Sequence, residues 1–167
     1  MCKYVRLIKR GRWPTEKEIN YNVDNVSAKT IVQEMAMKGT DNSLSIWQLE
    51  DKEDIALAVI SPNKQSVEKI TAVKISKEEL EKNGLEIKEQ NGNSVASYLN
   101  SKHFDIVNMN YKSLGSFAKV IIEALKDEEN LEVITQKEVE TILKNAISDG
   151  RIDKDTLSLG IINEIEK

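Results

Sequence analysis

One stretch of the chain limits the fold more than any other. Between Ser113 and Lys126, apolar residues recur at intervals of three and four, which is the spacing of one broad face of an α-helix. That face comprises Leu114, Phe117, Ala118, Ile121, Ile122 and Leu125. A helix with such a face must bury it against another element, and the short strand patterns elsewhere in the chain can supply that surface.

Strand patterns occupy several short stretches before and after this helix. They are rich in β-branched and aromatic residues and are bounded by turn residues. We assign strands to residues 4–8, 44–49, 70–75, 104–107 and 131–134, with the sequence LEIK at 85–88 as a weaker candidate. The apolar run from Ile70 to Ile75 has the composition of a central strand.

Helical patterns alternate with these strands. Ser27 precedes an apolar stripe of Ile31, Val32, Met35 and Ala36 that ends near Gly39, and Asp51 precedes a short helix from Lys52 to about Ser61. Parallel neighbours in a sheet need a crossover, which a helix commonly supplies. We therefore predict an α/β fold, with α+β as the competing class, built on a mixed sheet of about five strands.

The C-terminal region predicts a helical hairpin. Thr135 and Glu138 have the spacing of a capping box, and Gly150 follows the apolar face of that helix. Asp153 is the expected cap of a final helix bearing Leu157, Ile161, Ile162 and Ile165. Since no repeat or linker-like composition interrupts the pattern, we expect residues 1–167 to form a single globular domain.

The charge of the chain is unevenly distributed. Residues 1–13 contain five bases and no acid, so the remaining residues hold 19 bases against 28 acids. A basic strand of this kind can guard a sheet edge, dock a protein, or bind nucleic acid with its aromatic side chains stacking on bases. The nucleic-acid alternative assigns binding to Arg6, Lys9, Arg10, Arg12 and Trp13.

The sequence lacks the common catalytic constellations. It has no glycine-rich phosphate loop, no G-x-S-x-G motif, one histidine (His103) and one cysteine (Cys2). Glu-x-Lys pairs of the kind found in metal-dependent nucleases occur at the frequency that composition alone produces, at Glu50/Lys52 and Glu86/Lys88. We expect no catalytic residues, no metal and no cofactor, and keep a metal-dependent nuclease as part of the alternative.

Two acidic clusters precede or open predicted helices, where the helix dipole favours negative charge. They consist of Glu50, Asp51, Glu53 and Asp54, and of Glu78, Glu79 and Glu81. Both could also present carboxylates to a basic partner. By elimination, we predict a protein-binding module that acts as an immunity- or antitoxin-like inhibitor in bacterial defence. Its partner would be a basic protein, such as one that cleaves or binds nucleic acid.

The sequence also indicates a compartment. A single cysteine cannot form an intramolecular disulfide, and no apolar run approaches the ~20 residues of a membrane span. The charged N-terminus does not resemble a secretory signal. We therefore expect a cytoplasmic protein without membrane association.

Overall fold

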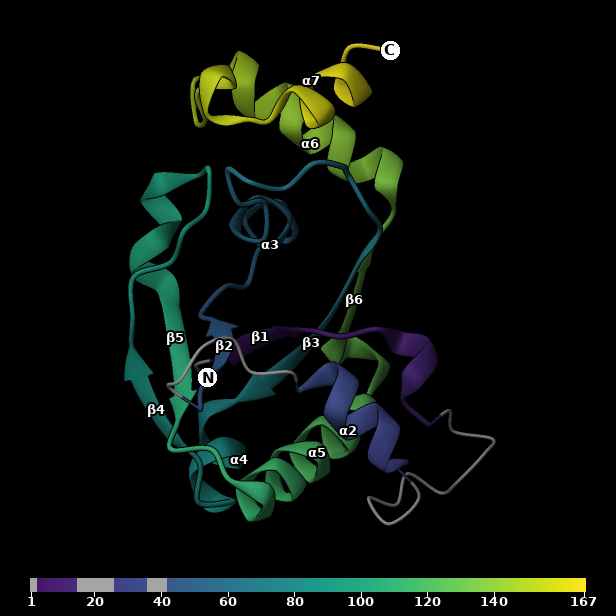
Figure 1. The fold of residues 1–167 in the computed structure, drawn as a ribbon, viewed down its shortest axis with the longest axis vertical. Helices are drawn as coiled ribbons and strands as arrows, with labels where there is room; N and C mark the ends of the chain where they lie inside the picture. The colour runs from purple at the N-terminus through teal and green to yellow at the C-terminus, as the bar shows by residue number, and fades with distance from the viewer. Residues whose placement is uncertain (1–2, 15–25, 36–41) are drawn as a thin grey trace.

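A six-stranded sheet forms the centre of the molecule (Figure 1). The computed structural model describes residues 3–14, 26–35 and 42–167. The strands lie in the order β4-β5-β2-β1-β3-β6. Their bounds are β1 Lys3–Leu7, β2 Leu44–Trp47, β3 Ile70–Ser76, β4 Glu86–Glu89, β5 His103–Val107 and β6 Leu131–Ile134.

The fold combines helices with a sheet, as predicted. The sheet has six strands where about five are expected, and β4 overlaps the weaker candidate at 85–88. The strand directions differ from those of the expected mixed sheet. Every neighbouring pair is antiparallel: β1 with β2 and β3, β5 with β2 and β4, and β3 with β6. Strands that follow one another through a helix, such as β2 and β3 through α3 (Lys52–Ala58), do run in the same direction, but β1 lies between them and is antiparallel to both. The helix α4 spans Lys77–Lys82 and leads from β3 to β4, which are not neighbours in the sheet.

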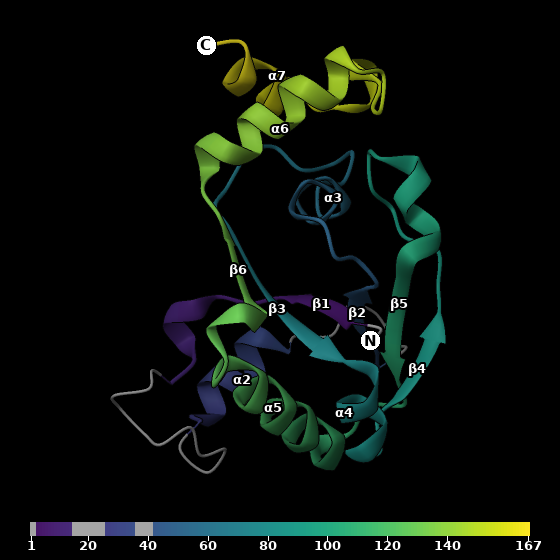
Figure 2. The same ribbon diagram turned by 180° about the vertical axis from the view of Figure 1, so that it is seen from behind.

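Helices cover both sides of the sheet (Figures 1 and 2). One side carries α3, α6 and α7, and the other carries α2, α4 and α5. The bounds of the others are α2 Ala28–Glu34, α3 Lys52–Ala58, α5 Tyr111–Leu125, α6 Gln136–Ser148 and α7 Leu159–Ile165. Short 3-10 helices are η1 Arg10–Arg12, η3 Ser97–Lys102, η4 Glu128–Asn130 and η5 Lys154–Thr156.

Each side of the sheet has its own apolar core. On β3, Ile70 and Ala72 face the α3 side, whereas Val73 and Ile75 face the α5 side. The predicted stripe of α5 is buried on the sheet, and its Phe117 is completely inaccessible. The strand from Ile70 to Ile75 is thus interior and buried on both faces, which explains its continuous apolar run.

The basic first strand is not an edge strand. It lies between β2 and β3, with Tyr4 buried on one face and Val5 on the other. The edges of the sheet are β4 and β6. Alternating basic and apolar residues resembled a charged edge in the sequence, but the bases of this segment bind within the fold, as described below.

Capping residues place most helix starts where the sequence predicts them. Ser27, Asp51 and Thr135 each accept a hydrogen bond from a backbone N–H in the first turn of their helices. Ser76 does the same at the start of α4. The last helix differs, because Asp153 caps η5 and α7 begins only after Ser158. The α6 and α7 helices pack together as the predicted C-terminal hairpin.

Two helices are shorter than predicted. The helix after Asp51 ends at Ala58. The helix after Ser27 ends at Glu34, and its predicted stripe is only partly buried, because Val32 is 71% exposed. The stripe residue Ala36 and the predicted stop at Gly39 lie outside the described residues.

Candidate protein-binding surface

The first acidic cluster lies at the start of α3. The Asp51 carboxylate accepts hydrogen bonds from the backbone N–H groups of Glu53 and Asp54, at 2.7 and 3.3 Å. Asp51 therefore has a structural role as the helix cap. Glu50 and Asp51 are nevertheless exposed at this helix end.

A tyrosine that the sequence analysis did not single out joins this cluster. Tyr98, from η3, donates its hydroxyl proton to Asp54 Oδ1 at 2.9 Å and remains 46% exposed. Burial raises the pKa of the Tyr98 hydroxyl, and the hydrogen bond to Asp54 raises it further, whereas Arg151 opposes the shift. Tyr98 is thus a neutral hydrogen-bond donor at neutral pH, and its ring is held in place.

Arg151 binds the same cluster from the turn after α6. Its guanidinium lies 2.9 Å from Glu53 Oε2 and 3.5 Å from Asp149 Oδ2. The hydrogen bond to Glu53 is the main cause of a raised Arg151 pKa. We call the assembly of Glu50, Asp51, Glu53, Asp54, Tyr98 and Arg151 the α3 surface. Its four carboxylates and one guanidinium leave it acidic.

The second acidic cluster lies on the opposite side of the sheet, on α4 (Figures 1 and 2). Glu79 lies 3.6 Å from Lys82, and Glu81 lies 3.5 Å from Lys77. Glu78 is exposed. The structure therefore separates the two predicted partner-binding clusters, and lysines of the same helix accompany the acids of α4.

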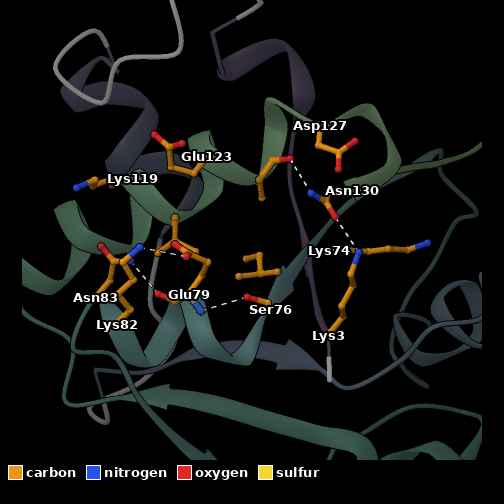
Figure 3. A pocket seen from close by; sticks show the side chains of 13 residues that line it. Lys3, Lys74, Ser76, Glu79, Lys82, Asn83, Lys119, Glu123, Asp127 and Asn130 are labelled. Carbon is orange, nitrogen blue, oxygen red and sulfur yellow. Dashed lines mark hydrogen bonds and ion pairs between the residues drawn. The ribbon is translucent and has the colours of Figure 1, made fainter. Parts of the chain in front are cut away.

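Glu79 also lines a depression of about 520 Å³ between α4 and α5, shown in Figure 3. At one end, Lys3 donates to Asn130 Oδ1 at 3.0 Å, and Lys74 lies 3.0 Å from Glu132. The rest of its wall includes Lys82 and Lys119 together with Glu79, Glu123 and Asp127. Because these charges nearly balance, the depression does not select a ligand of either sign.

Cationic side chains of the basic N-terminal segment donate hydrogen bonds to backbone carbonyl oxygens. Arg6 donates to the carbonyl oxygens of Ser45 and Glu34, at 2.8 and 3.0 Å. Burial lowers the Arg6 pKa, and the charge of Glu34 acts in the opposite direction. Arg10 donates to the carbonyl oxygens of Trp13 and Pro14.

Glu34 organises the remainder of this segment. Its carboxylate accepts from Arg12 at 2.8 Å, from the Lys9 backbone N–H at 2.7 Å and from the Trp13 indole at 3.2 Å. Trp13 is only 2% exposed, so its ring is not available for stacking on a base. The side chains of Arg6, Arg10, Arg12 and Trp13 thus make their contacts within the fold, whereas the Lys9 side chain is exposed.

His103 is buried and contacts neighbouring residues of the fold. Its Nδ1 lies 2.9 Å from the Gln90 carbonyl oxygen, so this nitrogen carries the donated proton. Its ring packs edge-on to Trp47, with centroids 4.7 Å apart, and Nε2 lies 3.8 Å from Asp105 Oδ1. In the described residues no serine or cysteine is hydrogen-bonded to the ring, so no nucleophile–base pair is formed there.

The Glu-x-Lys pairs are engaged in other contacts. Lys52 binds Glu138 at 2.7 Å, and Glu86 accepts from Asn108 at 2.7 Å. Across residues 3–14, 26–35 and 42–167, no three His, Cys, Asp or Glu side chains are grouped closely enough to hold a metal ion.

Comparison with protein-family models, with curated proteins and with solved structures finds no match for this chain. None of the helices in the described parts of the chain combines the length and apolar composition that a membrane span requires.

Proposed function

We propose that the protein is a non-catalytic protein-binding module that inhibits a basic partner, in the manner of an immunity protein or antitoxin, and that the α3 surface is its binding site. The single observation that supports this is the meeting of an acidic helix start with a half-exposed, hydrogen-bonded tyrosine at 46% exposure. Tyrosine is one of the residues that dominate binding energy at protein interfaces.

Tyr98 adds an ordered aromatic side chain to the acidic cluster. Its hydroxyl is bonded to Asp54, and Arg151 is bonded to Glu53 beside it. Little side-chain entropy is lost when groups that are already ordered bind a partner. Carboxylates around the ring would speed the approach of a basic protein, and this acceleration would weaken as salt rises.

The site chemistry is compatible with a partner that binds or cleaves nucleic acid, because such proteins carry basic surfaces. The nucleic-acid alternative receives less support. Of its five residues, Arg6 and Arg10 bind backbone carbonyls, Arg12 binds Glu34 and Trp13 is buried.

Quantitative capture from a nuclease-treated native lysate tests the proposal. The bait proteins are the tagged full chain, Tyr98→Ala, Glu50→Lys and the matched control Glu78→Lys on the opposite side. We expect a basic protein that is captured by the parent and the control and is depleted with both α3-surface variants.

Two results would overturn the proposal. One is recovery of nucleic acid without a stable protein partner from untreated lysate, with retention lost in a Lys9→Ala/Arg12→Ala variant. The other is a captured protein whose recovery is equal for all the charge and tyrosine variants.

A further inference from the structure

A basic groove lies away from the α3 surface, where β1 ends and β3 begins. The backbone N–H of Ile8 donates to the Thr71 carbonyl at 2.9 Å, which places the residues after β1 beside those before β3. The groove has a volume of about 420 Å³. Its cations come from two distant parts of the sequence: Lys9, Arg12, Lys64 and Lys69.

The charges of this groove do not balance, in contrast to those of the depression in Figure 3. Within the described residues its two acids are Glu34 and Glu68. The Glu34 side chain is 5% exposed and already accepts hydrogen bonds from three donors. Glu68 is 70% exposed and lies 3.6 Å from Lys64. Four cations against two acids make the groove positive in a chain whose net charge is -4.

Two of the lysines are available to a ligand. Lys9 and Lys69 are exposed, and within the described residues neither ammonium group lies within ion-pair distance of a carboxylate. An incoming anion would therefore not need to displace a carboxylate of the described residues from them.

The groove also has an aliphatic wall. Leu7 is 40% exposed there, next to Val59 and Ile70. Among the described residues no aromatic side chain lines the groove, so this part of the chain offers no stacking surface for a nucleobase there. Aliphatic contact combined with several lysines fits a ligand that has both carboxylates and an aliphatic side chain.

We propose that the basic groove binds a short acidic peptide segment of a protein partner, with one aliphatic side chain against Leu7 and carboxylates at Lys9 and Lys69. This site is independent of the proposed function, because its charge is opposite to that of the α3 surface. It also lies beyond the C-terminal end of α3, with Val59 in its wall.

Fluorescence anisotropy with the purified full chain tests the groove. The probe is a labelled peptide with the sequence Glu-Asp-Leu-Glu-Asp, and its counterpart has serine in place of leucine. We expect Lys9→Glu/Lys69→Glu to weaken binding of the leucine peptide by about tenfold. The control Lys144→Glu, an exposed lysine on α6, should leave binding unchanged. The serine peptide should bind more weakly than the leucine peptide, and Leu7→Ser should remove that difference.

Folding is checked by comparing thermal unfolding of each variant with that of the parent chain. The proposal is overturned if the leucine peptide does not bind the parent at millimolar concentration, or if the two charge variants bind it equally. Tighter binding of inorganic phosphate or a single-stranded oligonucleotide, lost in Lys9→Glu/Lys69→Glu, would replace the acidic peptide as the ligand. None of these results depends on the α3 surface, so the two proposals fail separately.

Discussion

The helices α3 and α4 lie on opposite sides of the sheet. Their first turns have similar sequences but different neighbours. Both α3 and α4 have a capping side chain followed by acids in the first turn. On α4, Glu79 and Glu81 lie near lysines three or four residues away. On α3, Glu53 and Asp54 bind Arg151 and Tyr98, which are distant in sequence. Local rules explain both acidic clusters, whereas long-range neighbours distinguish the surfaces.

The largest expected effect comes from a substitution that leaves a cavity in the core on the α5 side of the sheet. Phe117→Ala should lower the free energy of unfolding by about 3–5 kcal/mol, because it empties a fully buried position. Since Ala72 and Val73 of one strand belong to the two different cores, we expect the loss to destabilise both sides. Hydrogen exchange of α6 should therefore accelerate together with that of α5. Unchanged protection of α6 would show that the sides unfold independently.

Two glycines allow a matched comparison between the sides. At Gly160 in α7, an added Cβ would lie 2.1 Å from the Gln65 carbonyl oxygen, whereas at Gly115 in α5 it would meet nothing within 4 Å. Gly160→Ala should cost about 2 kcal/mol through overpacking. Gly115→Ala should stabilise the protein by about 0.5–1 kcal/mol, because alanine favours the helix. Chemical denaturation measures both, and effects of the same sign would contradict the account.

The caps should behave alike on the two sides. Asp51→Ala and Ser76→Ala each remove an acceptor for a backbone N–H at a helix start, and each should cost about 1 kcal/mol of folding stability. Asp51→Asn should retain most of the stability, because the amide oxygen can still cap. A difference above about 1 kcal/mol between the two alanine variants would show that the helix starts are not locally equivalent.

The smallest effect concerns the ion pair between α3 and α6. Hydrogen bonds from Lys52 and from Thr135 lower the Glu138 pKa from 4.5 to about 2. Because the folded value is the lower one, this interaction contributes stability above pH 4.5 and loses it as the pH falls toward about 2. Carboxyl NMR titration should show a raised Glu138 pKa in Lys52→Met. An unchanged value would assign the shift to Thr135 alone.

Much of the fold could be predicted from local patterns. The stripe of α5 and the caps Asp51 and Thr135 follow from residue chemistry within a few positions. Strand order and direction could not be predicted, because they depend on pairs such as Leu7 with Ala72 that local periodicity does not specify. The edge-strand interpretation of β1, one of the alternatives that the sequence leaves open, is wrong for the same reason.

The candidate site was predictable only in part. The acids of α3 are visible in the sequence, but Tyr98 lies 44 residues from its partner Asp54 in a segment without a clear pattern. The bases near the N-terminus are evident in the sequence, but their contacts are not. Glu34, the partner of Arg12, lies 22 residues away. Long-range side-chain pairs, rather than composition, decided which charged groups remained exposed.

The most direct measurement is the binding kinetics of the captured basic protein with Tyr98→Ala, Glu50→Lys and Glu78→Lys, by surface plasmon resonance. We predict that Tyr98→Ala weakens binding by about 30-fold, as expected for an interface residue worth about 2 kcal/mol. Glu50→Lys should chiefly slow association and reduce its salt dependence, because it reverses a rim charge. Glu78→Lys should match the parent chain. An equal or larger loss with Glu78→Lys, or unchanged binding with Tyr98→Ala, would contradict the assignment of the α3 surface.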